Sequence, residues 1–158
     1  MKKLIFSIIL LAILWGGYNT RSLAFADEGG ITGIMNYIHT TLEEKADDID
    51  LLARVIEFEC GADWCSDELQ YLTGAVVINR VYDSRFPDTI RGVIFAPGQY
   101  ATAGMLYTRN PSERSVKVAQ KIILWGVEDT PPDMVFQANF KQGYAVYAEL
   151  QGVYLWCG

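Results

Sequence analysis

The chain has 158 residues, 51% of them hydrophobic and 20% charged, which fits one folded domain and excludes a mainly disordered protein. Its formal net charge is −6, and a surface of this sign repels phosphate backbones, so we expect no nucleic-acid partner. A single His excludes a multi-histidine metal centre within one chain, and we expect neither a metal nor a cofactor.

Residues 1–26 have the pattern of a secretory signal peptide. Two lysines at positions 2 and 3 precede an apolar run from Leu4 to Trp15, and Ala24-Phe25-Ala26 provides a small-x-small cleavage site. We therefore expect cleavage after Ala26, a secreted or envelope-located monomer, and no membrane span in the mature chain. An uncleaved N-terminal anchor is the alternative, although the apolar run is shorter than the roughly 20 residues of a typical span.

Residues 27–49 are expected to form an amphipathic helix followed by an acidic linker. Apolar residues recur at helical spacing from Ile31 to Leu42, and residues 43–48 are rich in Asp and Glu. His39 lies in this segment, and a lone histidine there is not expected to be catalytic.

The main domain is expected over residues 50–158, and its first part is predicted to be helical. Predicted helices cover residues 51–59, 67–82, 90–95 and 111–125. Ser66, Thr89 and Asn110 stand where the N-caps of the last three helices are expected, and Gly126 is expected to end the last one.

The C-terminal part is predicted to be a small β-sheet. Residues rich in Val, Phe and Tyr follow Met134 and are separated by Gly143 and Gly152, which is typical of short strands. Residues 99–109, between the last two predicted helices, are expected to be irregular. The predicted fold class is therefore α+β, mostly helical with a small C-terminal sheet.

Glu59 is the candidate catalytic acid of the first predicted helix. At 100° per residue it falls on the apolar stripe with Leu52 and Ile56, whereas Glu57 falls on the opposite side, which we expect to be solvated. Burial and the negative end of the helix dipole both disfavour a charged carboxylate, which suits a group that must donate a proton. A glutamate paired with a core arginine is the alternative.

Asn79, Gln99 and Tyr100 are the candidate substrate-binding residues. Gln99 and Tyr100 follow the chain-breaking pair Pro97-Gly98, and an amide and a phenol can bind the hydroxyl groups and apolar faces of sugar rings. Arg80 follows Asn79 at the end of its helix, where an arginine commonly has a structural part.

Three cysteines, Cys60, Cys65 and Cys157, leave the disulfide pairing open. An exported chain reaches an oxidising compartment in which one bridge can form, while the odd count leaves one thiol over. A bridge between Cys60 and Cys65 would close a small loop, and one to Cys157 would tie down the C-terminal segment.

Several sequence pieces occur in a fixed order in the main domain: Leu51–Arg54 leading to Glu59, then Gly74–Val81, Phe86–Ile90 and Pro97–Tyr100. In this order and spacing they resemble the cell wall hydrolases of the SleB/CwlJ type, a family of spore cortex-lytic and related peptidoglycan enzymes. The resemblance covers about residues 50–126 well and the remainder loosely. It departs from the family where Cys60 replaces the usual Ala, and where Tyr100-Ala101 replaces Phe-Ser.

This resemblance implies a lysozyme-like α+β fold that cleaves the glycan strands of peptidoglycan, with Glu59 as the catalytic acid. One glutamate is enough for lytic transglycosylation, which closes a 1,6-anhydro ring, whereas ordinary hydrolysis needs a second carboxylate about 5–9 Å away. Asp63 is the nearest candidate in sequence. The resemblance also favours a Cys65–Cys157 bridge. A non-catalytic peptidoglycan-binding or envelope-interaction protein on the same scaffold is the alternative function.

Overall fold

The computed structural model describes residues 20–158, with side chains from residue 30 onward. Most of the signal peptide predicted over residues 1–26 therefore lies outside the described residues. The chain divides into two compact units, Met1–Thr40 and Thr41–Gly158. Among the helices described, none combines the length and the apolar character that crossing a bilayer requires.

Helix α2 (Thr20–Glu44) contains the apolar residues that recur over 31–42, and it is kinked at Gly30. Gly30 has φ 57° and ψ −145°, a conformation that glycine adopts without a steric penalty. The acidic segment expected as a linker is largely helical, because α2 ends at Glu44 and α3 (Ala46–Cys60) begins two residues later. Acidic residues in the first turn of α3 favour this start through the helix dipole.

The remaining helices are α4 (Asp67–Tyr82), α5 (Ile90–Phe95), the short 3-10 helix η1 (Ala103–Met105) and α6 (Glu113–Trp125). Two predicted caps are confirmed, since Ser66 accepts a hydrogen bond from the Leu69 amide and Thr89 accepts one from the Gly92 amide. The N-cap of α6 was predicted two residues too early, at Asn110. The residue that caps this helix is Ser112, whose hydroxyl accepts a hydrogen bond from the Ser115 amide.

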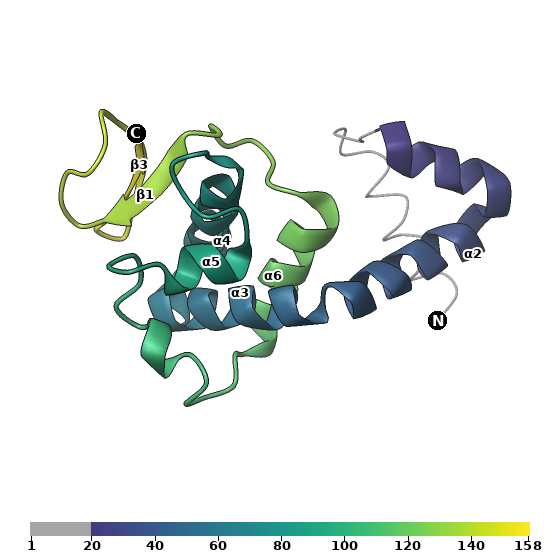
Figure 1. The fold of residues 1–158 in the computed structure, drawn as a ribbon, viewed down its shortest axis with the longest axis horizontal. Coiled ribbons are helices and arrows are strands. Elements are labelled where there is room, and N and C mark those ends of the chain that lie inside the picture. The colour runs from purple at the N-terminus through teal and green to yellow at the C-terminus, as the bar shows by residue number, and fades with distance from the viewer. Residues whose placement is uncertain (1–19) are drawn as a thin grey trace. The chain divides into compact units, whose positions relative to one another are not determined.

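Helix α3 lies at the centre of the helical core. It contacts α4, α5 and α6, and Figure 1 shows it passing beneath α4 and α5 with α6 beside it. Leu52, Val55 and Ile56 are fully buried, as the apolar stripe of this helix predicts. Burial of such a stripe removes apolar surface from water and holds α3 rigidly in place.

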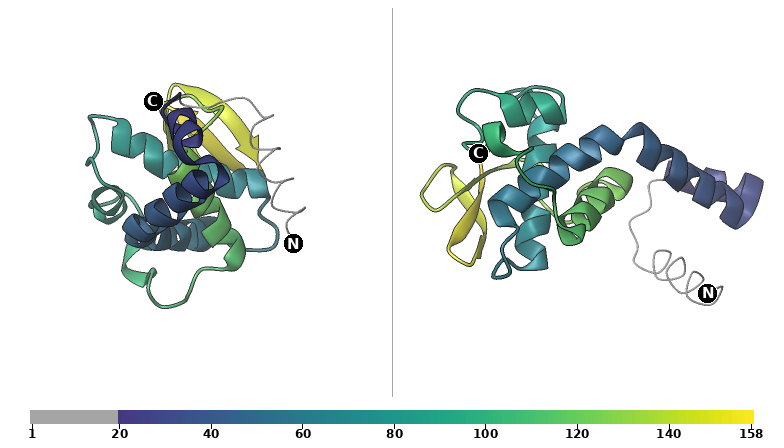
Figure 2. Two further views of the ribbon diagram at one scale, coloured as in Figure 1. Left: turned by 90° about the vertical axis from the view of Figure 1, so that its right-hand side faces the viewer. Right: turned by 90° about the horizontal axis from the view of Figure 1, so that it is seen from below.

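Strands β1 (Met134–Ala138), β2 (Ala145–Leu150) and β3 (Val153–Cys157) form an antiparallel sheet in the order β1-β3-β2. Strand β1 packs against α4, and Figure 2 shows the strands in yellow gathered at one side of the helices. A mostly helical domain with a small C-terminal sheet is what the sequence predicts, so the α+β class is confirmed.

The disulfide joins Cys60 to Cys65, and Cys157 is a free, buried thiol. The favoured Cys65–Cys157 pairing is therefore wrong. Cys60 ends α3 and Cys65 precedes α4, and the turn between them brings their Cα atoms to 5.7 Å, within the range that a disulfide spans. Cys157 is instead held in β3 opposite Met134 and Ala145, and burial raises the pKa of its thiol.

Candidate active site

The carboxylate of Glu59 is exposed in the last turn of α3. The expected burial of this side chain is therefore wrong, because the helical stripe that it shares with Leu52 and Ile56 is uncovered at its last turn. Glu59 Oε1 accepts a hydrogen bond of 2.7 Å from the hydroxyl of Thr102. An accessible carboxylate with a fixed donor beside it is suited to proton transfer with a bound substrate.

The main chain that carries Glu59 is fixed on its C-terminal side. Cys60 is 2% exposed and belongs to the disulfide, and its carbonyl accepts a hydrogen bond of 2.8 Å from the buried amide of Gln70. The amide of Gly61 donates to the Glu57 carbonyl at 2.9 Å. Since a reacting group must be held by a rigid support, this end of α3 is a suitable place for one.

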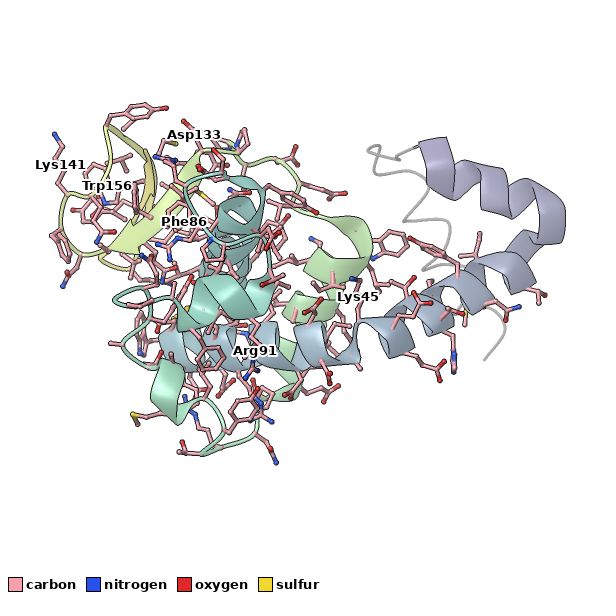
Figure 3. The ribbon with its side chains drawn as sticks, viewed as in Figure 1. Lys45, Phe86, Arg91, Asp133, Lys141 and Trp156 are labelled. Atoms are coloured by element: carbon pink, nitrogen blue, oxygen red, sulfur yellow. A yellow bond between two sulfur atoms is a disulfide. The ribbon has the colours of Figure 1, made fainter. Side chains whose placement is uncertain are left out.

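Arg80 and Tyr100 lie on the inner side of the site. Arg80 is 6% exposed at the end of α4, and its Nε donates to the Val135 carbonyl at 2.6 Å. Its guanidinium carbon lies 5.4 Å from the centroid of the Tyr100 ring and 5.2 Å from that of Phe86, which Figure 3 labels. Burial raises the pKa of Tyr100 to about 12, with Arg80 acting in the opposite direction and the charge of Glu59 adding to the rise.

Glu57 lies on the other side of α3 and reaches the N-terminus of α6. Its Oε2 accepts hydrogen bonds of 2.7 Å from the hydroxyls of Ser112 and Ser115 and one of 3.1 Å from the Ser112 amide. Only 12% of its side chain is exposed, so the solvated position expected for Glu57 is wrong. A Cβ on Gly61 would lie 2.6 Å from the Glu57 carboxyl carbon, so glycine leaves room for this arrangement.

Hydrogen bonds stabilise the charged form of the Glu57 carboxyl group. Burial alone would raise the pKa of this carboxyl group, but the hydrogen bonds from Ser112 and Ser115 and the nearby Arg109 guanidinium outweigh burial and lower the pKa. A charged carboxylate at the first turn of α6 is also favoured by the dipole of that helix. We therefore assign Glu57 to the attachment of α6 to α3, and not to the reacting site.

Residues 96–112, the α5–α6 loop, are held against α3 by Arg54. Its guanidinium donates to the carbonyls of Leu106 at 3.1 Å and Arg109 at 2.7 Å. Arg54 also forms an ion pair with Asp50, one helical turn away, at 2.7 Å. Because the α5–α6 loop carries Thr102, its attachment to α3 also brings the Thr102 hydroxyl to Glu59.

The three candidate substrate-binding residues lie in different surroundings. Asn79 is 7% exposed, and its side-chain amide donates to the carbonyls of Pro131 and Met134, each at 3.0 Å. Both of its donor hydrogens thus tie α4 to the start of β1, which gives it a structural role. Gln99 is exposed on the α5–α6 loop, whereas Tyr100 is half-buried with its hydroxyl enclosed.

Asp63, the nearest acidic candidate for a second carboxylate, is exposed in the turn that the disulfide closes. Within the part of the chain that the structure describes, no group of three or more His, Cys, Asp and Glu side chains is arranged to hold a metal ion. The hydrogen bond from Thr102 identifies Glu59 as the candidate reacting carboxylate.

Sequence reasoning missed Thr102. It lies in a loop that was expected to be irregular, 43 residues from Glu59 in the chain. A threonine shortly after the pair Gln99-Tyr100 was the available signal, but its contact with Glu59 depends on how the loop folds back onto α3.

Comparison with known proteins agrees with this fold. Residues 66–150 match the family described as Cell Wall Hydrolase, a match that begins after Glu59 and includes Asn79, Gln99 and Tyr100. The chain also resembles the solved catalytic domain of the Bacillus cereus SleB protein, with 24% sequence identity and a TM-score of 0.59. The alignment covers 72% of this chain and 91% of that domain, and it shows a shared fold. No curated protein matches the chain significantly.

Proposed function

Because this chain belongs to the cell wall hydrolase family, we propose that it cleaves the glycan strands of peptidoglycan with Glu59 as its general acid and base. The observation that carries the proposal is the exposed Glu59 carboxylate at the rigid end of α3, with the Thr102 hydroxyl 2.7 Å from Oε1. Peptidoglycan lies outside the cytoplasmic membrane, so the proposal includes export directed by residues 1–26 and a mature protein in the cell envelope.

The proposed reaction needs one carboxyl group. Protonated Glu59 gives its proton to the glycosidic oxygen as the bond from that oxygen to C1 breaks. The resulting carboxylate then takes the proton of the 6-hydroxyl of the same sugar, whose oxygen bonds to C1 and closes a 1,6-anhydro ring. No water is consumed, and Glu59 ends the cycle protonated.

The surroundings of Glu59 support this use of one residue. Accessibility lets the carboxyl group reach both the glycosidic oxygen and the 6-hydroxyl, and the Thr102 hydrogen bond fixes its orientation between the two steps. Hydrolysis would instead require a second carboxylate to activate water, and Asp63 is the side chain to test for that role.

The test is Glu59→Gln assayed on purified peptidoglycan. This change keeps the size of the side chain and removes its acidic proton, so we expect no release of soluble fragments while binding to insoluble peptidoglycan is retained. Fragment release equal to that of the wild type would overturn the assignment of Glu59. Binding by a wild-type protein that releases no fragments would favour the alternative of a peptidoglycan-binding protein.

Asp63→Asn and product masses distinguish the two chemistries. Transglycosylation predicts 1,6-anhydro ends, which are lighter than reducing ends by one water, and predicts that Asp63→Asn remains active. Reducing ends together with loss of activity in Asp63→Asn would show two-carboxylate hydrolysis. Glu68→Gln, an exposed substitution in the first turn of α4, is the matched control for removal of an acidic side chain.

A further inference from the structure

An exposed tryptophan lies in the turn that follows α3. Trp64 is 59% exposed between Cys60 and Cys65, the two residues that the disulfide joins. A large aromatic ring in this position leaves much apolar surface in contact with water. The exposed rings of Tyr107 and Phe95 are each contacted by an arginine, whereas within the described part of the chain no ring stacking or cation–π contact involves Trp64. Its indole is therefore available to a ligand.

The turn that carries Trp64 is fixed at both ends. Cys60 and Cys65 are 2% and 1% exposed, and their disulfide closes the turn. The Cys60 carbonyl accepts a hydrogen bond of 2.8 Å from Gln70, and the Cys65 carbonyl accepts one of 2.6 Å from Arg114. A side chain on a rigid support can bind a ligand without the entropic cost of ordering a loop, so this turn is suited to present Trp64 to a ligand.

The same turn keeps Trp64 close to Glu59. Glu59 adjoins Cys60 in the chain and Trp64 adjoins Cys65, while the Cα atoms of the two cysteines are 5.7 Å apart. Since consecutive Cα atoms are about 3.8 Å apart, the Cα atoms of Glu59 and Trp64 are separated by no more than about 13 Å. A glycan strand is a polymer that extends beyond the bond being cleaved, so its neighbouring sugar units can span this distance.

We propose that Trp64 is a substrate-binding residue whose indole stacks on a sugar ring of the glycan strand, on one side of the bond that Glu59 cleaves. The C–H groups on the face of a sugar ring are apolar, and the face of an indole is electron-rich, so the two faces pack together and exclude water. This inference rests on the proposed function, to which it adds a residue that recognises the sugar itself.

Binding measured without turnover tests the inference. The affinity of Glu59→Gln for glycan strands freed of their stem peptides would be determined by isothermal titration calorimetry. Adding Trp64→Ala should lower this affinity by about tenfold at an unchanged melting temperature, whereas Trp64→Tyr, which keeps an aromatic ring, should retain most of it. An affinity that Trp64→Ala leaves unchanged, or the absence of binding by Glu59→Gln itself, would overturn the inference.

Trp125→Ala is the matched control for removal of an exposed tryptophan. Trp125 is 42% exposed and is the last residue of α6, whose first turn is attached to Glu57. Because α6 has 13 residues, Trp125 lies about 18 Å further along the helix axis. We expect no change in the affinity for glycan strands. Equal losses in Trp125→Ala and Trp64→Ala would overturn the specific role of Trp64.

Kinetics separate this inference from the proposed function. With Glu59 intact, Trp64→Ala should raise KM for soluble glycan fragments by about tenfold and leave kcat nearly unchanged, because stacking on a sugar away from the reacting atoms contributes equally before and during the reaction. An unchanged KM would overturn the role of Trp64 even if Glu59→Gln is inactive. Fragment release by Glu59→Gln would instead reject the proposed catalytic function, and a raised KM in Trp64→Ala would still identify a sugar-binding residue.

Discussion

Glu57 and Glu59 stand two residues apart on α3 and face different partners. Glu57 accepts hydrogen bonds from Ser112 and Ser115 at the start of α6, whereas Glu59 accepts one from Thr102 on the α5–α6 loop. Two successive elements of the chain are thus attached to one turn of α3 through two carboxylates. The first attachment is largely buried and the second is open to solvent.

Replacing the largely buried Glu57 is expected to change how the free energy of unfolding depends on pH. The folded-state pKa of Glu57 is lowered, so its charge contributes stability that is fully present above the unfolded value of about 4.3 and is lost as the pH falls through the folded-state value. Glu57→Gln should therefore lower the free energy of unfolding at neutral pH by about 1–2 kcal/mol. Urea unfolding from about pH 3 to pH 7 should show the difference from wild type shrinking toward acid pH.

Glu113→Gln is the control for Glu57→Gln. Glu113 also has a lowered pKa, caused by its hydrogen bond with Lys117, but both side chains are exposed and their interaction is screened by solvent. No resolvable change in stability is expected. Equal effects of the two substitutions would contradict the anchoring role of Glu57.

Removal of the Thr102 hydroxyl should lower activity and leave the fold intact. Thr102→Val keeps the shape of the side chain but removes the donor to Glu59, so we expect kcat/KM on peptidoglycan to fall by about tenfold at an unchanged melting temperature. Thr108→Val is the matched control, because the Thr108 hydroxyl donates to the Met105 carbonyl within the same loop. Similar kinetic losses in both variants would point to a general disturbance of the loop.

The disulfide predicts a small effect of reducing agents. A bridge between residues only five apart, Cys60 and Cys65, is expected to contribute about 2 kcal/mol in the chain-entropy model. Non-reduced protein should yield a Cys60–Cys65 cross-linked peptide by mass spectrometry, and Cys157 should react with an alkylating agent only after unfolding. A Cys65–Cys157 cross-link, or a Cys157 that is readily alkylated in native protein, would disagree with the structure.

Asn79→Ala is expected to lower stability and to spare the chemistry. The change removes the side-chain donor to the buried Met134 carbonyl and one of two donors to the Pro131 carbonyl, which also accepts from the Met134 amide. The free energy of unfolding should therefore fall by about 1–3 kcal/mol. The exposed Asn110, changed to Ala, should have little effect. Folded Asn79→Ala should turn over peptidoglycan with an unchanged KM, and a raised KM at wild-type stability would restore the substrate-binding assignment.

The sequence predicts the helices, most of their caps and the strands well because these signals are local. The hydroxyls of Ser66 and Thr89 each cap an amide three residues ahead, and Gly152 separates β2 from β3. The surroundings of Glu57 and Glu59 could not be predicted in this way. Helical periodicity shows which residues share a side of α3, but it does not show what packs against that side. Glu57, for example, is bound by Ser112, which lies 55 residues later in the chain.

The sheet order has a consequence for how the domain is made. Strand β3 is the central strand, and it follows both of its neighbours in the chain. Neither β1 nor β2 therefore has a partner until β3 has left the ribosome, while the segments that form α3 to α6 are already available to pack. We expect the helices to associate first during synthesis and the sheet to be added in one late step, so that Asn79 gains its two carbonyl acceptors only when the β1 region has assembled.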